Sequence, residues 1–193
     1  MILNEKDLLN KKYKILICGS GPAGLSVALE LEKNKIECLI VEAGDEFFSE
    51  KAQNRYNGQI IGNFPDNLSV SRLSQFGGTS GHWGGTCRTL DSYDFKEWPI
   101  TKDDLEPYLK ESCNILEIPN SFREKQITQN LKIIEFQESD VRFHDKYYKH
   151  VANSKYIDVC LNSVINNVKI QNSIIQEIFI KSKKSFSIKA DFL

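Results

Sequence analysis

Hydrophobic residues near the start of the chain form two short runs separated by a helical pattern. Residues 13–18 and 38–41 are nearly continuous apolar runs, which are typical of parallel strands covered on both faces. Between them, apolar residues recur at helical spacing from Leu25 to Leu31, and we expect this helix to end near Asn34, with Asn34 in the left-handed capping conformation. The pattern predicts a complete βαβ unit of about 30 residues.

Near the other end, the apolar pattern changes to short runs separated by turn residues. Four strands are predicted, with turns at Gln171–Asn172 and Lys181–Lys184, over residues 156–161, 164–170, 174–180 and 186–192. The last run alternates through Phe186, Ile188, Ala190 and Phe192, and no turn follows it. We therefore expect the strand that would lead back into the central sheet to be missing.

The middle of the chain has little periodicity. Residues 43–94 are rich in Gly, Ser and Asn, which favours extended cofactor-binding loops over regular elements. Thr101–Asp104 resembles a capping box and predicts a short turn, followed by a helix with Pro107 at its first position that ends near Leu116. Residues 118–150 are polar and weakly patterned, with an amphipathic segment around residues 127–136.

Composition excludes several classes of protein. The chain has 193 residues, of which 40% are hydrophobic and 26% charged, so we expect a globular protein. A net charge of -1 gives no electrostatic reason to expect a nucleic-acid partner. Residues 1–12 do not read as a secretory signal, and no apolar stretch is long enough to span a membrane. Five scattered cysteines indicate neither a zinc site nor a disulfide framework, so a cytoplasmic protein with reduced thiols is expected.

The clearest chemical motif is a dinucleotide fingerprint directly after the first predicted strand. Gly19 permits a tight turn, Gly21 lets the backbone approach a pyrophosphate, and Gly24 allows the helix to lie close to the strand. The helix N-terminus would then offer N–H groups to the phosphates. Glu42 ends the second strand, where a carboxylate accepts hydrogen bonds from ribose hydroxyls. The motif alone leaves NAD and FAD open, along with a glycine turn in another α/β protein.

A second glycine-rich segment covers residues 77–85, with the sequence GGTSGHWGG. Its glycines allow backbone amides to approach a flat ligand, so we expect one cofactor, FAD, to be held by both segments. A glycine-rich hairpin with Trp83 as a core residue is the structural alternative. A serine-hydrolase elbow is rejected, because His82 stands where that motif requires glycine.

These segments resemble the glucose-methanol-choline (GMC) oxidoreductases, especially their bacterial sugar and alcohol dehydrogenases. The resemblance rests on residues 71–72 and 76–88, followed by the Leu-Asp, Asp-Phe, Trp-Pro and Leu-Glu-Pro-Tyr groups between residues 90 and 108. It is strong over residues 12–116 and looser over residues 143–193. It implies an α/β Rossmann-like FAD-binding domain with a parallel sheet and a β-meander, incomplete at the C-terminus.

The resemblance also implies a function and a set of contacts. The reaction would be oxidation of an alcohol or sugar CH–OH group by hydride transfer to the flavin, with an unknown electron acceptor. The implied cofactor-binding residues are Gly19, Gly21, Pro22, Ala23, Gly24, Glu42, Arg72, Gly77, Gly78, Thr79, Ser80, His82, Trp83 and Gly84. Some relatives attach FAD covalently through a histidine at the position of His82, and in others it is a hydrogen-bonding or packing residue. His144 and His150 match no family motif and are interpreted as surface or core histidines.

The resemblance implies a division of the chain into three regions and leaves the catalytic base unassigned. It implies an FAD-binding region over residues 1–116, part of a substrate domain or insert over 117–150, and a strand and β-meander over 151–193. Family members are longer, and the histidine that takes the hydroxyl proton lies in their C-terminal part. No catalytic residue is therefore assigned here, and no metal site is expected. The rival interpretations are a non-catalytic flavin-binding remnant and another FAD- or NAD-binding Rossmann oxidoreductase.

Overall fold

The computed structural model describes residues 1–8, 11–62 and 67–193. Residues 9–10 fall within the N-terminal segment considered as a signal, and residues 63–66 fall within the predicted cofactor loops; both lie outside the described residues. The chain forms two compact units. The first unit contains residues 1–83 and 142–193, and the second unit contains residues 84–141.

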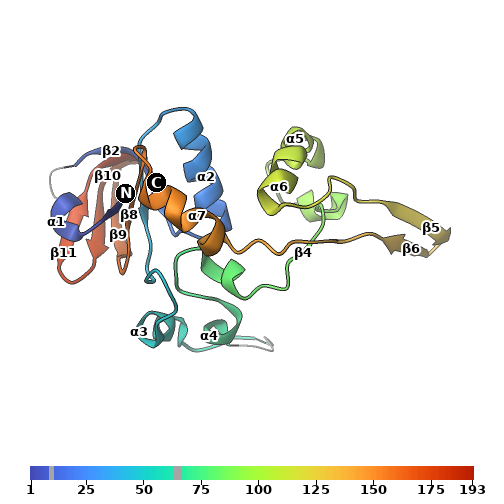
Figure 1. The fold of residues 1–193 in the computed structure, drawn as a ribbon, viewed down its shortest axis with the longest axis horizontal. Helices are drawn as coiled ribbons and strands as arrows, with labels where there is room; N and C mark the ends of the chain where they lie inside the picture. Colours follow the sequence, from blue (N-terminus) through green and yellow to red (C-terminus); the bar gives the residue numbers. More distant parts are fainter. Residues whose placement is uncertain (9–10, 63–66) are drawn as a thin grey trace. The chain divides into compact units, whose positions relative to one another are not determined.

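A five-stranded parallel sheet forms the centre of the first unit (Figure 1). Its strands, in spatial order, are β1 (Ile2–Leu3), β8 (Ile157–Cys160), β3 (Cys38–Val41), β2 (Tyr13–Cys18) and β12 (Ala190–Phe192). The strands predicted at residues 13–18 and 38–41 are confirmed at those bounds, and β8 confirms the strand predicted near residues 156–161. β1 has only two residues, which is too short for a periodic pattern to reveal.

The two faces of this sheet are covered by different elements. Leu16, Leu39 and Val41 join a buried cluster with Ile178 and Ile180 of the meander. Because side chains alternate along a strand, the neighbours of these residues face the opposite side, where helix α2 (Pro22–Lys33) packs on β2, β3 and β8. Figure 1 shows the meander on one side of the sheet and α2 on the other. β3 is therefore apolar throughout, and β2 nearly so, because both faces of the sheet are covered.

The meander consists of three antiparallel strands in the order β11–β10–β9. They are β9 (Val164–Gln171), β10 (Ile174–Lys181) and β11 (Ser185–Ile188). The alternating run at the end of the chain is not one strand, as predicted, but two, since it leaves the meander after Ile188. β12 then pairs in parallel with β2, with Ala190 opposite Tyr13. The expectation that no strand returns to the central sheet is therefore wrong.

Helix α2 ends at Lys33, close to the predicted position, but its closing residue differs. Asn34 has φ of -90°, and the left-handed conformation falls instead on Lys35, with φ of +58°. The Asn34 side chain still closes the helix, because its amide nitrogen donates to the Glu30 carbonyl oxygen at 2.9 Å.

Short helical turns occupy most of the long loop region of the first unit. The elements outside the sheet, the meander and α2 are α1 (Glu5–Leu8), α3 (Glu50–Gln53), η1 (Asn54–Tyr56), α4 (Leu68–Ser71), η2 (Gly78–Gly81) and α7 (Phe143–Ala152). None of those between β3 and Trp83 exceeds four residues, among the residues described, which agrees with the prediction of loops over this region. Helix α7 was not predicted; it packs on β8 and η2.

The second unit contains two short sheets and a helical segment. Its elements are β4 (Thr86–Cys87), η3 (Ser92–Phe95), α5 (Lys102–Leu105), η4 (Glu106–Tyr108), α6 (Leu109–Leu116), β5 (Glu124–Thr128), β6 (Leu131–Ile134) and β7 (Gln137–Glu138). The capping box at Thr101 and the helix end at Leu116 are confirmed. Pro107 lies in the 3-10 turn η4, so α6 begins after it, at Leu109. The amphipathic segment around residues 127–136 is part of the β5–β6 hairpin.

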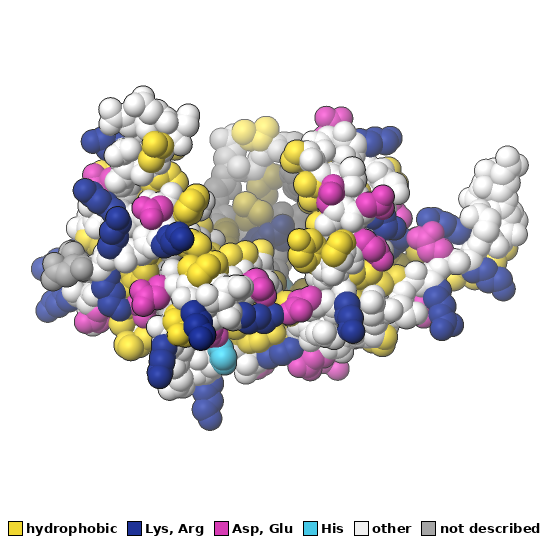
Figure 2. Space-filling view, turned by 90° about the horizontal axis from the view of Figure 1, so that it is seen from above, with side chains coloured by type: hydrophobic (Ala, Val, Ile, Leu, Met, Phe, Trp, Pro, Cys, Tyr) yellow, Lys and Arg dark blue, Asp and Glu magenta, His cyan; other side chains and the backbone are white. Residues whose placement is uncertain are grey.

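The visible surface in Figure 2 carries charges of both signs. On the face drawn in Figure 2, lysine and arginine side chains alternate with aspartate and glutamate. No helix within the described part of the chain is long and apolar enough to cross a bilayer.

Candidate cofactor site

The fingerprint forms a tight loop between β2 and α2. The Gly19 N–H donates to the Val41 carbonyl oxygen at 2.9 Å, and Gly19 has φ of +89°, a conformation that favours glycine. A Cβ atom placed on Gly24 would lie 2.1 Å from the Gly19 carbonyl oxygen. Both glycines are therefore required by the local geometry, as the fingerprint predicts.

The next part of the loop leaves space at the start of α2. Gly21 is the N-cap residue, in an extended conformation, and Pro22 follows at the first helical position. No side chain caps this end of the helix, and a Cβ atom on Gly21 would meet nothing within 4 Å. The free N–H groups of a helix start and its positive dipole end favour an anion such as a diphosphate in this space.

The second glycine segment lies directly against the first. The Gly77 N–H donates to the Ser20 carbonyl oxygen at 3.1 Å. A Cβ atom on Gly78 would lie 3.0 Å from the Gly21 Cα atom. The two motifs, about 55 positions apart in the chain, therefore form one continuous backbone surface.

Helix α7 holds the second segment in place. Ser80 is 1% exposed; its hydroxyl donates to the Gly77 carbonyl oxygen at 2.7 Å and accepts from the Phe143 N–H at 3.1 Å. Gly77 has φ of +82°, and a Cβ atom on it would lie 2.5 Å from the His144 backbone nitrogen. Trp83 makes an edge contact with the Phe143 ring, at 6.4 Å between centroids. Ser80 and Trp83 thus support the second glycine segment through their contacts with α7.

Glu42 connects the fingerprint to the end of β3. It is 6% exposed, and its Oε2 atom accepts from both the Ser20 N–H, at 2.8 Å, and the Ser20 hydroxyl, at 2.7 Å. Its Oε1 atom accepts from the Gly44 N–H at 2.6 Å. Because a carboxylate has about four acceptor positions, these bonds leave about one for a ligand. The carboxylate therefore orders the loop as well as facing the cavity.

A cavity of about 390 Å³ lies between these segments. This volume is within the range of small-molecule sites, about 300–1,000 Å³. The predicted residues that line it are Gly19, Gly21, Pro22, Glu42, Gly78 and Thr79. The open space at Gly21, the uncapped helix start and the glycine surface fit the diphosphate part of a dinucleotide.

The other predicted residues lie outside this lining. Ala23 and Gly24 continue into α2, and Gly77, Ser80 and Trp83 support the second segment. Arg72 is exposed, and its guanidinium donates to the Ser71 carbonyl oxygen at 3.0 Å. His82 is also exposed, and its backbone N–H donates to the Thr79 carbonyl oxygen. Gly84 is exposed and begins the second unit.

Several lining residues were not predicted. They are Cys18, Val41, Ala43, Tyr56, Leu73, Ser163, Val164 and Ile165. Burial, followed by the nearby Glu42 charge, raises the pKa of the Tyr56 hydroxyl. Residues 163–165 follow β8, which lies beside β3, so they occupy the carboxyl edge where ligands of parallel sheets bind. The predicted strand at residues 156–161 could have indicated this segment, whereas Tyr56 carries no sequence signal.

Comparisons with known proteins agree with this geometry. A family model described as an FAD binding domain matches residues 14–53. No curated protein sequence matches the chain. Among solved structures, pyridoxine 4-oxidase from Mesorbium loti has a TM-score of 0.58 and 16% identity over 93% of this chain and 48% of its own. A fungal aryl-alcohol oxidase has a TM-score of 0.61 and 13% identity over 95% of this chain and 45% of its own.

These similarities establish the fold and bear on the cofactor. The chain has the α/β fold found in these two oxidases and spans about half the length of each. The matched residues 14–53 contain the whole fingerprint and Glu42, so the prediction of an FAD-binding Rossmann-like domain is confirmed.

Proposed function

We propose that this chain is the FAD-binding part of a GMC-type oxidoreductase that oxidises the CH–OH group of an alcohol or sugar. The observation that carries the proposal is the contact of Gly78 with Gly21, since it joins the fingerprint and the second glycine segment into one surface. A fingerprint alone would serve NAD equally well, whereas a second segment against the first supports FAD. The similarity in fold to a pyridoxine 4-oxidase and an aryl-alcohol oxidase supports the same class.

In this proposal the chain's residues bind and orient the cofactor. The start of α2 and Gly21 hold the diphosphate, and Glu42 accepts from a ribose hydroxyl at its remaining position. Gly78 and Thr79 continue the wall, and Ser80 supports the segment that carries them. Arg72, outside the lining, is proposed as a further contact because the resemblance implies it. FAD, when bound, supplies the acceptor for the hydride removed from the substrate carbon. His82 is treated as a noncovalent contact.

The proposal also assigns a role to each region of the chain. We assign residues 1–116 and 151–193 to cofactor binding and residues 117–150 to a substrate domain or insert, except that residues 143–150 form part of α7, which lies in the first unit and supports the cofactor site. No residue of this chain is assigned as the base that takes the hydroxyl proton. A base contributes about 10²–10⁴-fold to the rate, so turnover by these residues alone is expected to be slow at best. The protein is proposed to work in the cytoplasm.

A titration of the apo-protein tests the cofactor. Flavin fluorescence should change on addition of FAD and saturate at one equivalent, and NAD⁺ in excess should not displace FAD. Tight binding of NAD⁺ without binding of FAD would contradict the proposal. Acid precipitation of the FAD-loaded protein should leave the yellow colour in the supernatant; colour in the pellet would show a covalent bond, with His82 as the residue to replace.

A dye-reduction assay tests the reaction class. The panel should include sugars, aryl alcohols and pyridoxine, the last two because of the names of the structural neighbours. The chain with FAD alone should be nearly inactive, and addition of the C-terminal part of a GMC oxidoreductase, which carries that family's catalytic histidine, should raise the rate. Binding of FAD with no turnover under either condition would favour the flavin-binding remnant instead.

A further inference from the structure

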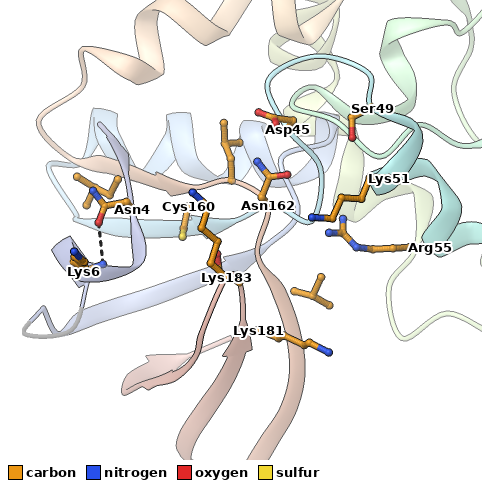
Figure 3. Close-up of a pocket in the computed structure, with 14 residues that line it drawn as sticks. Asn4, Lys6, Asp45, Ser49, Lys51, Arg55, Cys160, Asn162, Lys181 and Lys183 are labelled. Atoms are coloured by element: carbon orange, nitrogen blue, oxygen red, sulfur yellow. Dashed lines mark hydrogen bonds between the residues drawn. The ribbon is translucent and has the colours of Figure 1, made fainter.

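A second and larger cavity, of about 1250 Å³, lies in the first unit and shares Val164 with the lining of the cofactor cavity. Five cationic side chains line it: Lys6, Lys51, Arg55, Lys181 and Lys183. They come from α1, α3, η1, the end of β10 and the turn that follows β10. In Figure 3, Lys51 and Arg55 lie side by side on one side of the cavity, and Lys183 reaches from the meander toward the Cys160–Asn162 segment.

The charge of this cavity is not balanced by the groups around it. Among the described side chains that line it, Asp45 is the one acidic residue, and its Oδ1 atom accepts from the Glu46 N–H at 2.7 Å. Among the side chains that the structure describes, Lys51, Lys181 and Lys183 form no ion pair. A hollow lined by charges of one sign concentrates the field and attracts ions of the opposite sign.

The cations are presented by ordered elements. The Ser49 hydroxyl accepts from the Ala52 N–H at 3.2 Å and so caps α3, which carries Lys51. The Arg55 guanidinium donates to the Ala43 carbonyl oxygen, which fixes the side chain across the loop. Lys183 lies in a tight turn closed by the Ser182 N–H and the Lys184 carbonyl oxygen at 3.0 Å. Backbone structure therefore determines where Lys51 and Lys183 lie in the chain fold, whereas their side chains are exposed; only the Arg55 side chain is held by a hydrogen bond.

The lining also indicates the kind of anion. The described lining residues include no aromatic side chain on which a nucleobase could stack, and the uncharged polar ones are Asn4, Ser49, Asn162 and Ser182. Lysine binds phosphate as a point charge, and amides and hydroxyls donate further hydrogen bonds. The volume exceeds the usual range for small-molecule sites, about 300–1,000 Å³, so a single phosphate would not bridge the opposite sides.

We propose that this cavity binds a small anion that carries several phosphate groups, at a site separate from the FAD site. Of the described residues, Val164 alone belongs to both linings. Lys51 and Lys183, which approach from opposite sides, would each contact a different phosphate. The site does not depend on the proposed oxidoreductase activity.

Calorimetric titration of the full chain with tripolyphosphate tests this proposal. One equivalent should bind at about 0.15 M salt, where exposed charges are screened beyond about 8 Å. Lys51→Glu/Lys183→Glu should weaken binding at least about tenfold, and Lys51→Gln/Lys183→Gln, which is gentler on folding, should weaken it less. Lys110→Glu/Lys155→Glu makes the same charge change at exposed lysines outside the lining and should leave the affinity unchanged.

Other outcomes separate this site from rival explanations. Equal weakening by both pairs of glutamate substitutions would show nonspecific charge attraction and overturn the proposal. An oligoglutamate peptide that binds as tightly as tripolyphosphate would overturn the assignment to phosphate. Binding should be unchanged when the protein is saturated with FAD; competition between the two would show that the cavities form one cofactor site. The titration requires no flavin signal, so failure of the FAD proposal would not affect its result.

Discussion

Replacement of Gly21 by alanine separates folding from cofactor binding. Gly21 has φ of -68° and ψ of 179°, which alanine adopts without strain, and a Cβ atom there would meet nothing within 4 Å. Substitution of glycine at a compatible site stabilises a protein by about 0.4–1 kcal/mol, since it reduces the freedom of the unfolded chain. Gly21→Ala should therefore fold as well as the original chain, or slightly better.

The same methyl group should interfere with FAD. It would occupy the open space at the start of α2 where the diphosphate is expected. An extra methyl in a closely fitted site costs about 1–3 kcal/mol. FAD should therefore bind about fivefold to a hundredfold more weakly, because about 1.4 kcal/mol corresponds to a factor of ten.

The assay combines urea unfolding with flavin titration. Gly58→Ala is the matched control, because a Cβ atom at this exposed glycine also meets nothing within 4 Å; it should show the same small gain in stability or none, and it should leave the FAD affinity unchanged. Gly24→Ala is the opposite case: its Cβ atom would lie 2.1 Å from the Gly19 carbonyl oxygen, so the urea midpoint should fall. Unchanged FAD affinity in Gly21→Ala would show that the diphosphate does not lie at this helix start.

Two further predictions concern carboxylates that accept several hydrogen bonds, the buried Glu42 and the partly buried Asp158. Glu42→Gln should lower the free energy of unfolding by about 1–3 kcal/mol, since the amide nitrogen cannot accept from the donors that Glu42 binds. Glu37→Gln, at an exposed position, should have little effect. Urea unfolding compares the two variants, and equal urea midpoints would refute the reasoning. Burial raises the pKa of Asp158, but hydrogen bonds, first from Lys11, outweigh it and hold the pKa below its usual value of 3.8. The stabilisation is then present above that value and is lost as the pH falls through the folded pKa, so Asp158→Asn should lower the thermal midpoint at pH 7 and make less difference near pH 3.

The βαβ unit could be predicted from the sequence because its constraints are local. Apolar runs covered on both faces give continuous strands. Gly19 is required by the turn after the first strand, and Gly24 by its close approach to the Gly19 carbonyl group, within the same six positions. The return of the chain to the sheet could not be predicted in the same way. Alternation from Phe186 to Phe192 fits one strand as well as two, and the change of sheets at Lys189 leaves no periodic signal.

Helix α7 illustrates the limit of pattern analysis in polar segments. Phe143, Tyr147 and Val151 are spaced four residues apart and could have indicated a helical face, but the charged residues between them hide the pattern in a weakly periodic region. The importance of the helix is tertiary: its first turn lies against Gly77 and Ser80. The need for glycine at position 77 therefore comes from a residue 67 positions away, which no local motif reveals.

Glu42 has one expected contact that the sequence predicts and others that depend on the folded chain. Its position after the second strand predicts a ribose contact, because the carboxyl ends of parallel strands face the ligand. Its bonds to Ser20 and Gly44 depend on how two loops approach each other, and only the folded chain brings these donors to both oxygens. Since the buried carboxylate orders the same loop that carries Gly21, its loss would change the diphosphate site even if no ribose touched it. A ribose contact at Glu42 therefore requires a test in which the loop stays intact: FAD and a 2′-deoxyribose analogue should differ in affinity for the unaltered protein, and equal affinities would assign Glu42 a purely structural role.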